Sequence, residues 1–361
     1  MKLLITGANG FLGKYVVAAA LKRGHEVTAM VRPTSSTNLF GEEKQKNLKF
    51  VRADLRNRRS IPDAIRGQDT ILHLAASKCG DIYEQMGGTV LATENLLESM
   101  LEAEVKHIVA ISSFSVYGYS DLKSRSVLTE ETAVEPRPET RDAYCQTKLL
   151  QENLVRDFAM EANWRWTILR PGVIYGRDNE WTARIGMQLG SRTWVRTGAS
   201  AQLPLTYVEN CAETIVIAAE KAQAHGEILN VVDNETPTQR WYANQVRKRM
   251  KDKPRIIPVN WTLMKLIAAA GQLVNKWAFG GRAKTPSILL PAALQARCKP
   301  LRYSNQKIRA VLNWEPTFSV TQALDRCFSK DDLYDLPTLP ATQETVAKCS
   351  PQTQTVEIVG S

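Results

Sequence analysis

The chain has 361 residues, 43% of them hydrophobic, and a formal net charge of +10. This length suits one large domain or two coupled ones. The lysines and arginines are scattered and form no aromatic-interleaved face of the kind that binds nucleic acid. The six cysteines and four histidines lack metal-ligand spacing, so we expect no metal site and reduced thiols in a cytoplasmic protein.

The first predicted elements are a strand, a glycine-rich loop and a helix. The apolar run 3–5 predicts a buried strand, and apolar periodicity predicts a helix over 11–23. Between them, Gly7 allows a sharp turn, Gly10 lets the backbone approach a pyrophosphate, and Gly13 lets the helix pack on the strand. The helix N-terminus attracts phosphate. This combination predicts a dinucleotide-binding unit.

Further along the chain, short apolar strands alternate with helices. The predicted strands are 2–6, 26–31, 48–52, 70–74, 107–112 and 165–170, and the main helices are 11–23, 60–66, 83–103 and 143–162. Alternation of this kind predicts an α/β fold, a Rossmann-type doubly wound parallel sheet. We expect a cofactor-binding domain over 1–175, an interleaved, smaller C-terminal substrate lobe over 176–328, and a disordered polar tail over 336–361.

One of these helices carries Tyr144 and Lys148, which share a face because they are four residues apart. A free tyrosine titrates near pH ~10, and lowering its pKa by about three units takes roughly 4 kcal/mol. A fixed cation and a bound nicotinamide could supply that energy, and the phenol could then exchange a proton with a substrate oxygen. The spacing alone also fits a packed tyrosine beside a solvated lysine.

Six ordered motifs decide between these alternatives. Over roughly residues 1–328 the chain resembles the extended short-chain dehydrogenases/reductases. The matching segments are 6–13, Asp54-Leu55, 73–76, 112–118, 144–148 and 169–176. This resemblance implies that Tyr144 is the general acid/base, that Lys148 holds the nicotinamide ribose and lowers the tyrosine pKa, and that Ser113 hydrogen-bonds the substrate oxygen. Ser112 and Ser115 are neighbouring alternatives for that hydroxyl.

The resemblance also implies a set of cofactor contacts. They are Thr6, Gly7, Asn9, Gly10, Phe11, Leu12, Gly13, Arg32, Asp54, Leu55, Leu74, Ala75, Ala76, Thr93, Ser112, Tyr144, Lys148, Pro171 and Val173.

Two positions depart from the family pattern. Thr89 stands where the family has an asparagine that supports the lysine and a relay water, which puts that relay in doubt. Val31-Arg32 stands where NAD-preferring members have an aspartate, so a 2′-phosphate is no longer repelled and could pair with the guanidinium. NADP is therefore favoured over NAD, the alternative being that Arg32 is a solvated loop residue.

Substrate class is indicated less directly. Leu203 occupies the position where nucleotide-sugar enzymes of the family carry a diphosphate-binding arginine, although Arg192, Arg196 or Arg302 could compensate. The segment 207–212 resembles the 3β-hydroxysteroid dehydrogenase and dihydroflavonol reductase branch. We therefore expect a dehydrogenase or reductase that interconverts a secondary alcohol and a ketone. The alternatives are a sugar or nucleotide-sugar epimerase/dehydratase and a non-catalytic cofactor-binding protein.

An apolar stripe follows at helical spacing, comprising Val259, Leu263, Leu266, Ile267, Ala270, Leu273, Val274 and Trp277. Polar residues interrupt it, so no transmembrane helix is expected. Core packing is the first expectation for this stripe, a lid over an apolar substrate the second, and weak membrane-surface contact the third. By analogy with the family, the helices 83–103 and 143–162 are expected to form a homodimer. Reaction direction and substrate identity do not follow from the sequence.

Overall fold

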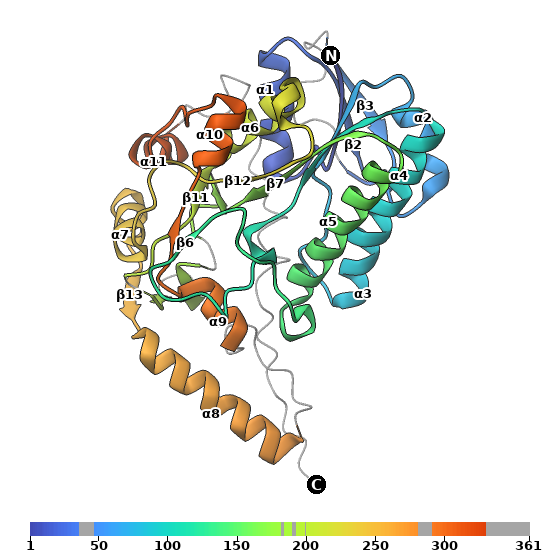
Figure 1. Ribbon diagram of the computed structural model, residues 1–361. Coiled ribbons are helices and arrows are strands. Elements are labelled where there is room, and N and C mark those ends of the chain that lie inside the picture. Colours follow the sequence, from blue (N-terminus) through green and yellow to red (C-terminus); the bar gives the residue numbers. More distant parts are fainter. Residues whose placement is uncertain (36–46, 182–183, 190–192, 199, 281–290, 330–361) are drawn as a thin grey trace.

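The computed structural model describes residues 1–35, 47–181, 184–189, 193–198, 200–280 and 291–329. Its centre is a seven-stranded parallel sheet with the strand order β12-β7-β5-β4-β1-β2-β3 (Figure 1). The strands are β1 (Lys2–Thr6), β2 (Glu26–Val31), β3 (Leu48–Arg52), β4 (Thr70–His73), β5 (His107–Ile111), β7 (Arg165–Pro171) and β12 (Glu227–Val231). Strand order reverses between β1 and β4, and such a switch point opens a ligand crevice at the carboxyl ends of the strands.

Successive residues of β1 enter two different cores. Leu3 and Ile5 join the cluster formed with α1 (Phe11–Lys22) and α6 (Val208–Glu220), whereas Leu4 joins the cluster with α4 (Ala92–Glu102) and α5 (Ala143–Glu161). This alternation follows from the two-residue period of a strand. Figure 1 shows the resulting helix layers on opposite faces of the sheet, α10 (Gln306–Leu312) and α11 (Val320–Phe328) being on the α6 side.

Smaller sheets and helices follow the main sheet. β8 (Val173–Tyr175) pairs with β11 (Leu205–Tyr207), β6 (Val127–Leu128) pairs with β14 (Arg302–Tyr303), and β10 (Thr193–Arg196) lies between β9 (Gly186–Leu189) and β13 (Arg255–Pro258). The remaining helices are α2 (Pro62–Ile65), α3 (Ile82–Gln85), α7 (Gln239–Arg249), α8 (Trp261–Phe279) and α9 (Pro291–Cys298), with 3-10 turns at Arg58–Ser60, Phe114–Val116, Pro138–Thr140 and Ala222–Ala224.

The predicted fold class is confirmed, the six predicted strands form as β1–β5 and β7, and three local expectations are corrected. The helix expected over 83–103 is divided into α3, a π-helix (η2, Met86–Leu91) and α4. The expectation of six reduced thiols is wrong at Cys79, which is disulfide-bonded, because spacing along the chain does not reveal such pairs. Four other cysteines remain thiols: Cys145, Cys211, Cys298 and Cys327. The tail 336–361 lies outside the described residues.

The third correction concerns the apolar stripe, for which core packing is wrong. The helix forms as predicted, but Leu266, Leu273 and Trp277 are exposed to solvent. The side that packs is the one with Met264 and Ala268. Helical periodicity shows which residues share a face, and it does not show whether anything covers that face. None of the described helices is long and apolar enough to cross a membrane.

Candidate active site

The glycine loop joins β1 to α1 at the carboxyl edge of the sheet. Gly7 has a left-handed φ of +67°, and a Cβ there would lie 3.0 Å from the amide nitrogen of Ala75. A Cβ on Gly13 would overlap the carbonyl oxygen of Gly7, so the helix starts directly against the loop. Asn9 directs a buried Oδ1 into this region that has no hydrogen-bond partner within the described residues. The backbone cradle fits a dinucleotide pyrophosphate, whereas the Asn9 amide oxygen is an acceptor and would need a hydroxyl or amide donor.

His73 at the end of β4 connects this loop to α4. The Thr6 hydroxyl accepts hydrogen bonds from the amides of Leu74 and Ala75 (3.1 and 3.2 Å) and lies 2.8 Å from His73 Nδ1. His73 Nε2 lies 2.9 Å from Thr93 Oγ1. Burial, aided by the nearby Lys148, lowers the His73 pKa to about 3. The ring is therefore neutral, and Thr6 donates to Nδ1 while Nε2–H points to Thr93, a tautomer assigned from its partners.

Tyr144 and Lys148 lie in the first two turns of α5, whose N-terminus is capped by the Asp142 carboxylate accepting from the Cys145 amide (2.9 Å). Lys148 is only 3% exposed, so the alternative of a solvated lysine is wrong. Its Nζ donates to the Ile111 carbonyl at 2.7 Å and lies 6.0 Å from the centroid of the Tyr144 ring. Burial, more than the nearby cation Lys78, lowers the Lys148 pKa to about 7.

Gln151 is a site residue that sequence reasoning missed. Its Oε1 accepts from Lys148 Nζ at 2.7 Å, and its Nε2 donates to Thr93 Oγ1 at 2.9 Å. Gln151 therefore connects the lysine to the His73–Thr93 pair. The signal was available, because positions 144, 148 and 151 fall on one helical face. A lone glutamine on a helix ordinarily indicates only a solvated surface.

Ser113 lies two residues after the end of β5 and caps the 3-10 turn Phe114–Val116. Its Oγ accepts from the Ser115 amide at 3.1 Å, which leaves the hydroxyl hydrogen available for another acceptor. The turn packs against α5, the helix of Tyr144. Ser112 and Ser115 each have a buried Oγ without a partner among the described residues. The three hydroxyls therefore lie within one segment beside α5.

Thr89, at the position of the missing family asparagine, lies in the π-helix and is fully buried. Its Oγ1 accepts from the Ser77 amide at 3.0 Å, and its carbonyl accepts from the Thr93 hydroxyl at 2.6 Å. Thr89 thus holds the loop after β4 in place and also orients the Thr93 hydroxyl that contacts His73. Gln151, from the opposite helix, contacts the lysine instead.

The adenine end expected from the sequence lies at β2 and β3. Arg32 is exposed directly after β2, and Arg52 shapes its loop by donating to the carbonyls of Pro33 and Ser35 (2.9 and 2.8 Å). Asp54 pairs with Arg56 at 2.6 Å, and its pKa is lowered by that hydrogen bond. Leu55 is buried beneath. Of the other expected contacts, Gly10 and Ala76 lie in loops, Pro171 and Val173 lie at strand ends, and Phe11 and Leu12 begin α1.

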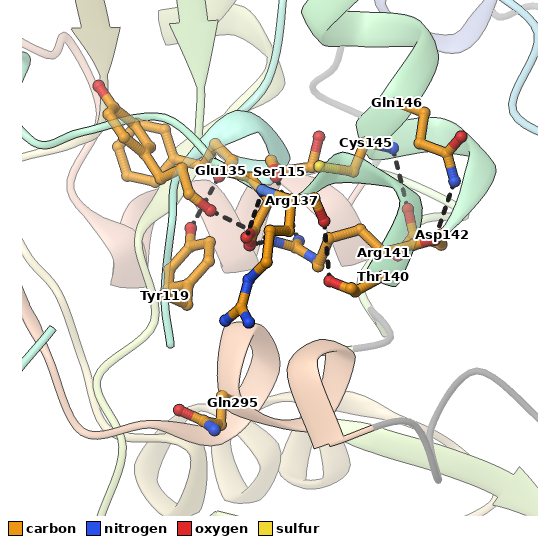
Figure 2. A network of polar contacts seen from close by, with 12 residues as sticks. Ser115, Tyr119, Glu135, Arg137, Thr140, Arg141, Asp142, Cys145, Gln146 and Gln295 are labelled. Atoms are coloured by element: carbon orange, nitrogen blue, oxygen red, sulfur yellow. Dashed lines mark hydrogen bonds and ion pairs between the residues drawn. The ribbon is translucent and has the colours of Figure 1, made fainter. Parts of the chain in front are cut away.

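Arginine side chains also lie near the N-terminus of α5. Arg141 forms a buried ion pair with Glu135 at 3.0 Å and donates to the carbonyls of Tyr117 and Ser115 (both 3.1 Å), which ties the Ser113 segment to α5. Figure 2 shows this network, with Arg137 pointing toward α9, the helix of Gln295. Arg184 donates to the Tyr119 hydroxyl at 2.9 Å.

The described residues expected to bear on diphosphate binding belong to different elements: Arg196 ends β10, Leu203 precedes β11 and Arg302 begins β14. Leu203 is completely buried in the α6-side core, so it faces neighbouring side chains. Arg196 is 6% exposed, and its Nε has no partner among the residues that the structure describes, whereas Arg302 is exposed. Arg192 lies outside the described residues.

A family profile described as the NAD dependent epimerase/dehydratase family matches residues 3–231. The chain belongs to this family. Its fold and its relatives make it an NAD(P)-dependent enzyme of the extended short-chain dehydrogenase/reductase type. Within the described residues, no group of three or more histidine, cysteine or acidic side chains could hold a metal ion.

Similar proteins include dehydrogenases, reductases and epimerases. A 3-beta-hydroxysteroid dehydrogenase of Mycolicibacterium neoaurum is 25% identical, with 96% of each chain covered. Cinnamoyl-CoA reductase 2 of Medicago truncatula is 26% identical, covering 73% of this chain and 84% of the relative. Among solved structures, a UDP-glucuronic acid 4-epimerase from Bacillus cereus has a TM-score of 0.68 at 21% identity, covering 91% of this chain and 98% of the epimerase. That structural likeness concerns the fold alone.

Proposed function

We propose that this enzyme interconverts a secondary alcohol and a ketone on a largely apolar substrate. The observation that carries the proposal is the buried Lys148 ammonium, held by Ile111 and Gln151 beside Tyr144 at the carboxyl edge of the sheet. Burial of an ammonium costs free energy. Such groups are found at functional sites, where they stabilise a negative charge that develops nearby. A phenol that gains and loses a proton in each catalytic cycle develops such a charge.

In this mechanism each residue has a distinct role. Residues 1–175 bind the cofactor and 176–328 hold the substrate. A bound nicotinamide cofactor supplies or accepts the hydride. Tyr144 gives a proton to the substrate oxygen in reduction and removes it in oxidation, while Ser113 donates a hydrogen bond to the same oxygen. Lys148 stabilises the phenolate, and Gln151 positions Lys148.

The apolar substrate is supported by two observations. Leu203 is buried where a diphosphate-binding arginine would be expected, and the relatives named above include a steroid dehydrogenase and a cinnamoyl-CoA reductase. The second candidate is a sugar or nucleotide-sugar epimerase/dehydratase, which the guanidinium of Arg184 beside Tyr119 favours. A reductase consumes reduced cofactor with a ketone, and absorbance at the reduced-nicotinamide band measures this. An epimerase retains its cofactor without net consumption.

The acid/base role is tested by Tyr144→Phe, which removes only the hydroxyl. We expect kcat to fall by about 10³-fold while cofactor affinity changes little. Tyr83→Phe is the matched control, because the Tyr83 side chain is 81% exposed to solvent. Full turnover in the Tyr144 variant would overturn the mechanism.

We also propose that NADP is preferred, with Arg32 pairing with the 2′-phosphate. Arg32→Asp should weaken NADP binding and strengthen NAD binding, as measured by titration of each cofactor. Arg66→Asp is the control, since this exposed arginine precedes β4 and lies at the opposite sheet edge. An unchanged ratio of the two affinities would show that Arg32 does not bind the phosphate.

A homodimer through the α4 and α5 layer completes the proposal. Leu91, Leu101 and Leu150 are more than 40% exposed on this side of the sheet. Light scattering after size exclusion should give twice the chain mass, and Leu150→Glu should shift it toward the monomer. A monomeric parent chain would contradict this part.

A further inference from the structure

Helix α8 extends away from the rest of the molecule (Figure 1). Asn260 caps its N-terminus by accepting from the Thr262 amide, and Gly280 ends it in a left-handed conformation. One side of the helix packs on α9, where Met264 and Ala268 form a small core with Leu294 and Cys298. The fold therefore anchors α8 along one narrow side and leaves the others uncovered by the described residues.

A second side of α8 is apolar and exposed. Its six large side chains have exposed fractions between 43% and 82%: Leu263, Leu266, Ile267, Leu273, Val274 and Trp277. At about 100° per residue they fall within an arc of roughly 120°. Ile257 on the adjacent β13 is also exposed. A continuous apolar face of this kind marks an interaction surface.

The charge around this face has one sign. Lys265 and Lys276 lie eleven residues apart, and both fall on the arc beside the apolar face. The whole segment 253–314 contains eleven lysines and arginines and no aspartate or glutamate. The rest of the chain has 36 basic against 37 acidic residues, so the net positive charge belongs to this segment. The complementary partner is an extended anionic surface.

We propose that α8 lies in the surface of a bilayer that carries anionic lipid, with its apolar side in the acyl boundary and its lysines at the headgroups. Trp277 is 82% exposed in the last turn of the helix, and tryptophan is favoured at that boundary. Pairing with a second copy is disfavoured, because it would bring two basic segments together.

Docking in this orientation places α9 between the lipid and the substrate lobe. The Cys298 thiol of α9 lies 3.2 Å from Thr197 Oγ1 beyond β10, and Gln239 donates to the Arg297 carbonyl at 3.4 Å. An apolar substrate dissolved in the bilayer would thus reach the lobe past a single short helix. The lipid contact itself is independent of the reaction, and only this route for substrate rests on the proposed function.

The test is co-sedimentation of the full chain with vesicles of phosphatidylcholine alone or mixed with phosphatidylserine. The triple variant Leu266→Ser, Leu273→Ser, Trp277→Ser removes much of the exposed apolar face. The control is Phe328→Ser, an exposed apolar side chain (38%) at the end of α11, outside both α8 and the proposed dimer layer. We expect binding to the mixed vesicles, at least tenfold weaker binding of the triple variant, and no change in the control.

The charge component is tested by Lys265→Glu with Lys276→Glu, which should weaken binding to the mixed vesicles by roughly fivefold per lysine removed and reduce its salt dependence. Three results would overturn the proposal. The parent chain could fail to bind mixed vesicles, the triple variant could bind like the parent, or light scattering could show that the triple substitution dissociates an oligomer. Turnover of a water-soluble ketone without vesicles should be equal in parent and triple variant, which separates this test from that of the reaction.

Discussion

Lys148 and Trp277 depart from the usual distribution of side chains in opposite directions. The lysine is 3% exposed and the tryptophan is 82% exposed. Soluble proteins keep lysine in water and bury most of a tryptophan, so each position has a cost that the fold alone does not explain. In both cases a side chain lies in the environment that is less favourable for it. Functional residues can therefore be sought by this one criterion both in the interior and on the surface.

The largest effect is expected at the buried side of this comparison. Lys148→Met keeps the length of the side chain and removes its charge, so kcat/KM should fall by about 10³-fold. Steady-state kinetics with saturating cofactor measure this. Lys265→Met on the exposed α8 is the control and should leave the kinetics unchanged. A loss below about tenfold would mean that the buried charge is structural.

A second buried charge tests whether burial alone marks a catalytic site. Asp233 is 3% exposed and accepts from the Tyr207 amide at 2.8 Å, and burial raises its pKa to about 7. The folded state therefore holds a proton between about pH 4 and 7 that the unfolded state has released. Stability should fall as pH rises through this window, by up to about 4 kcal/mol.

Asp233→Asn keeps the acceptor for Tyr207 and removes the titration. Its free energy of unfolding, measured by urea at pH 5 and pH 8, should differ less between the two pH values than that of the parent chain. An equal difference in both proteins would assign the pH dependence to other groups. Turnover at pH 5 should be similar in the two, because Asp233 has no role in the proposed proton transfer.

Gln151 should have an intermediate effect, because it acts through Lys148. Gln151→Leu leaves the ammonium with one fewer acceptor and should lower kcat by roughly 10- to 100-fold. Gln151→Glu places a carboxylate beside Nζ and should raise the lysine pKa by about one unit or more. The alkaline limit of the pH–rate profile should then move upward. A profile that is the same in the parent and the glutamate variant would contradict the positioning role.

The smallest effect is expected on the exposed side. Trp277→Ser should change the free energy of unfolding by less than about 0.5 kcal/mol, since the side chain is already in water. Met264→Ala, on the packed side of the same helix, should cost about 2–5 kcal/mol. Urea unfolding of both variants checks the pair. A large loss in the Trp277 variant would show that this side is covered in solution.

Much of the first half of the fold could be predicted from sequence. The apolar runs of β1 to β5 and the glycines at 7, 10 and 13 act locally, through strand burial and backbone geometry. β12 was not predicted, because Glu227–Val231 lies in a region where the periodicity is irregular. The spacing of Gln151 puts it on the helical face of Tyr144 and Lys148, but it does not reveal the contact with Thr93 from another helix. The exposure of the apolar face of α8 depends on whether another element covers it; none of the described residues does, and no pattern within the helix encodes this.

The π-helix at Met86–Leu91 has a consequence for how this enzyme tolerates length changes. A π-turn holds one residue more than an α-turn, so removing one residue would leave a continuous α-helix from α3 to α4. It would also rotate the preceding part by about 100° and withdraw Thr89 from the Ser77 amide. A Cβ added at Gly88 would lie only 2.9 Å from Ser77 Cβ, so this position favours glycine. A single-codon deletion here would therefore preserve helix content and disconnect the helix from the loop that follows β4.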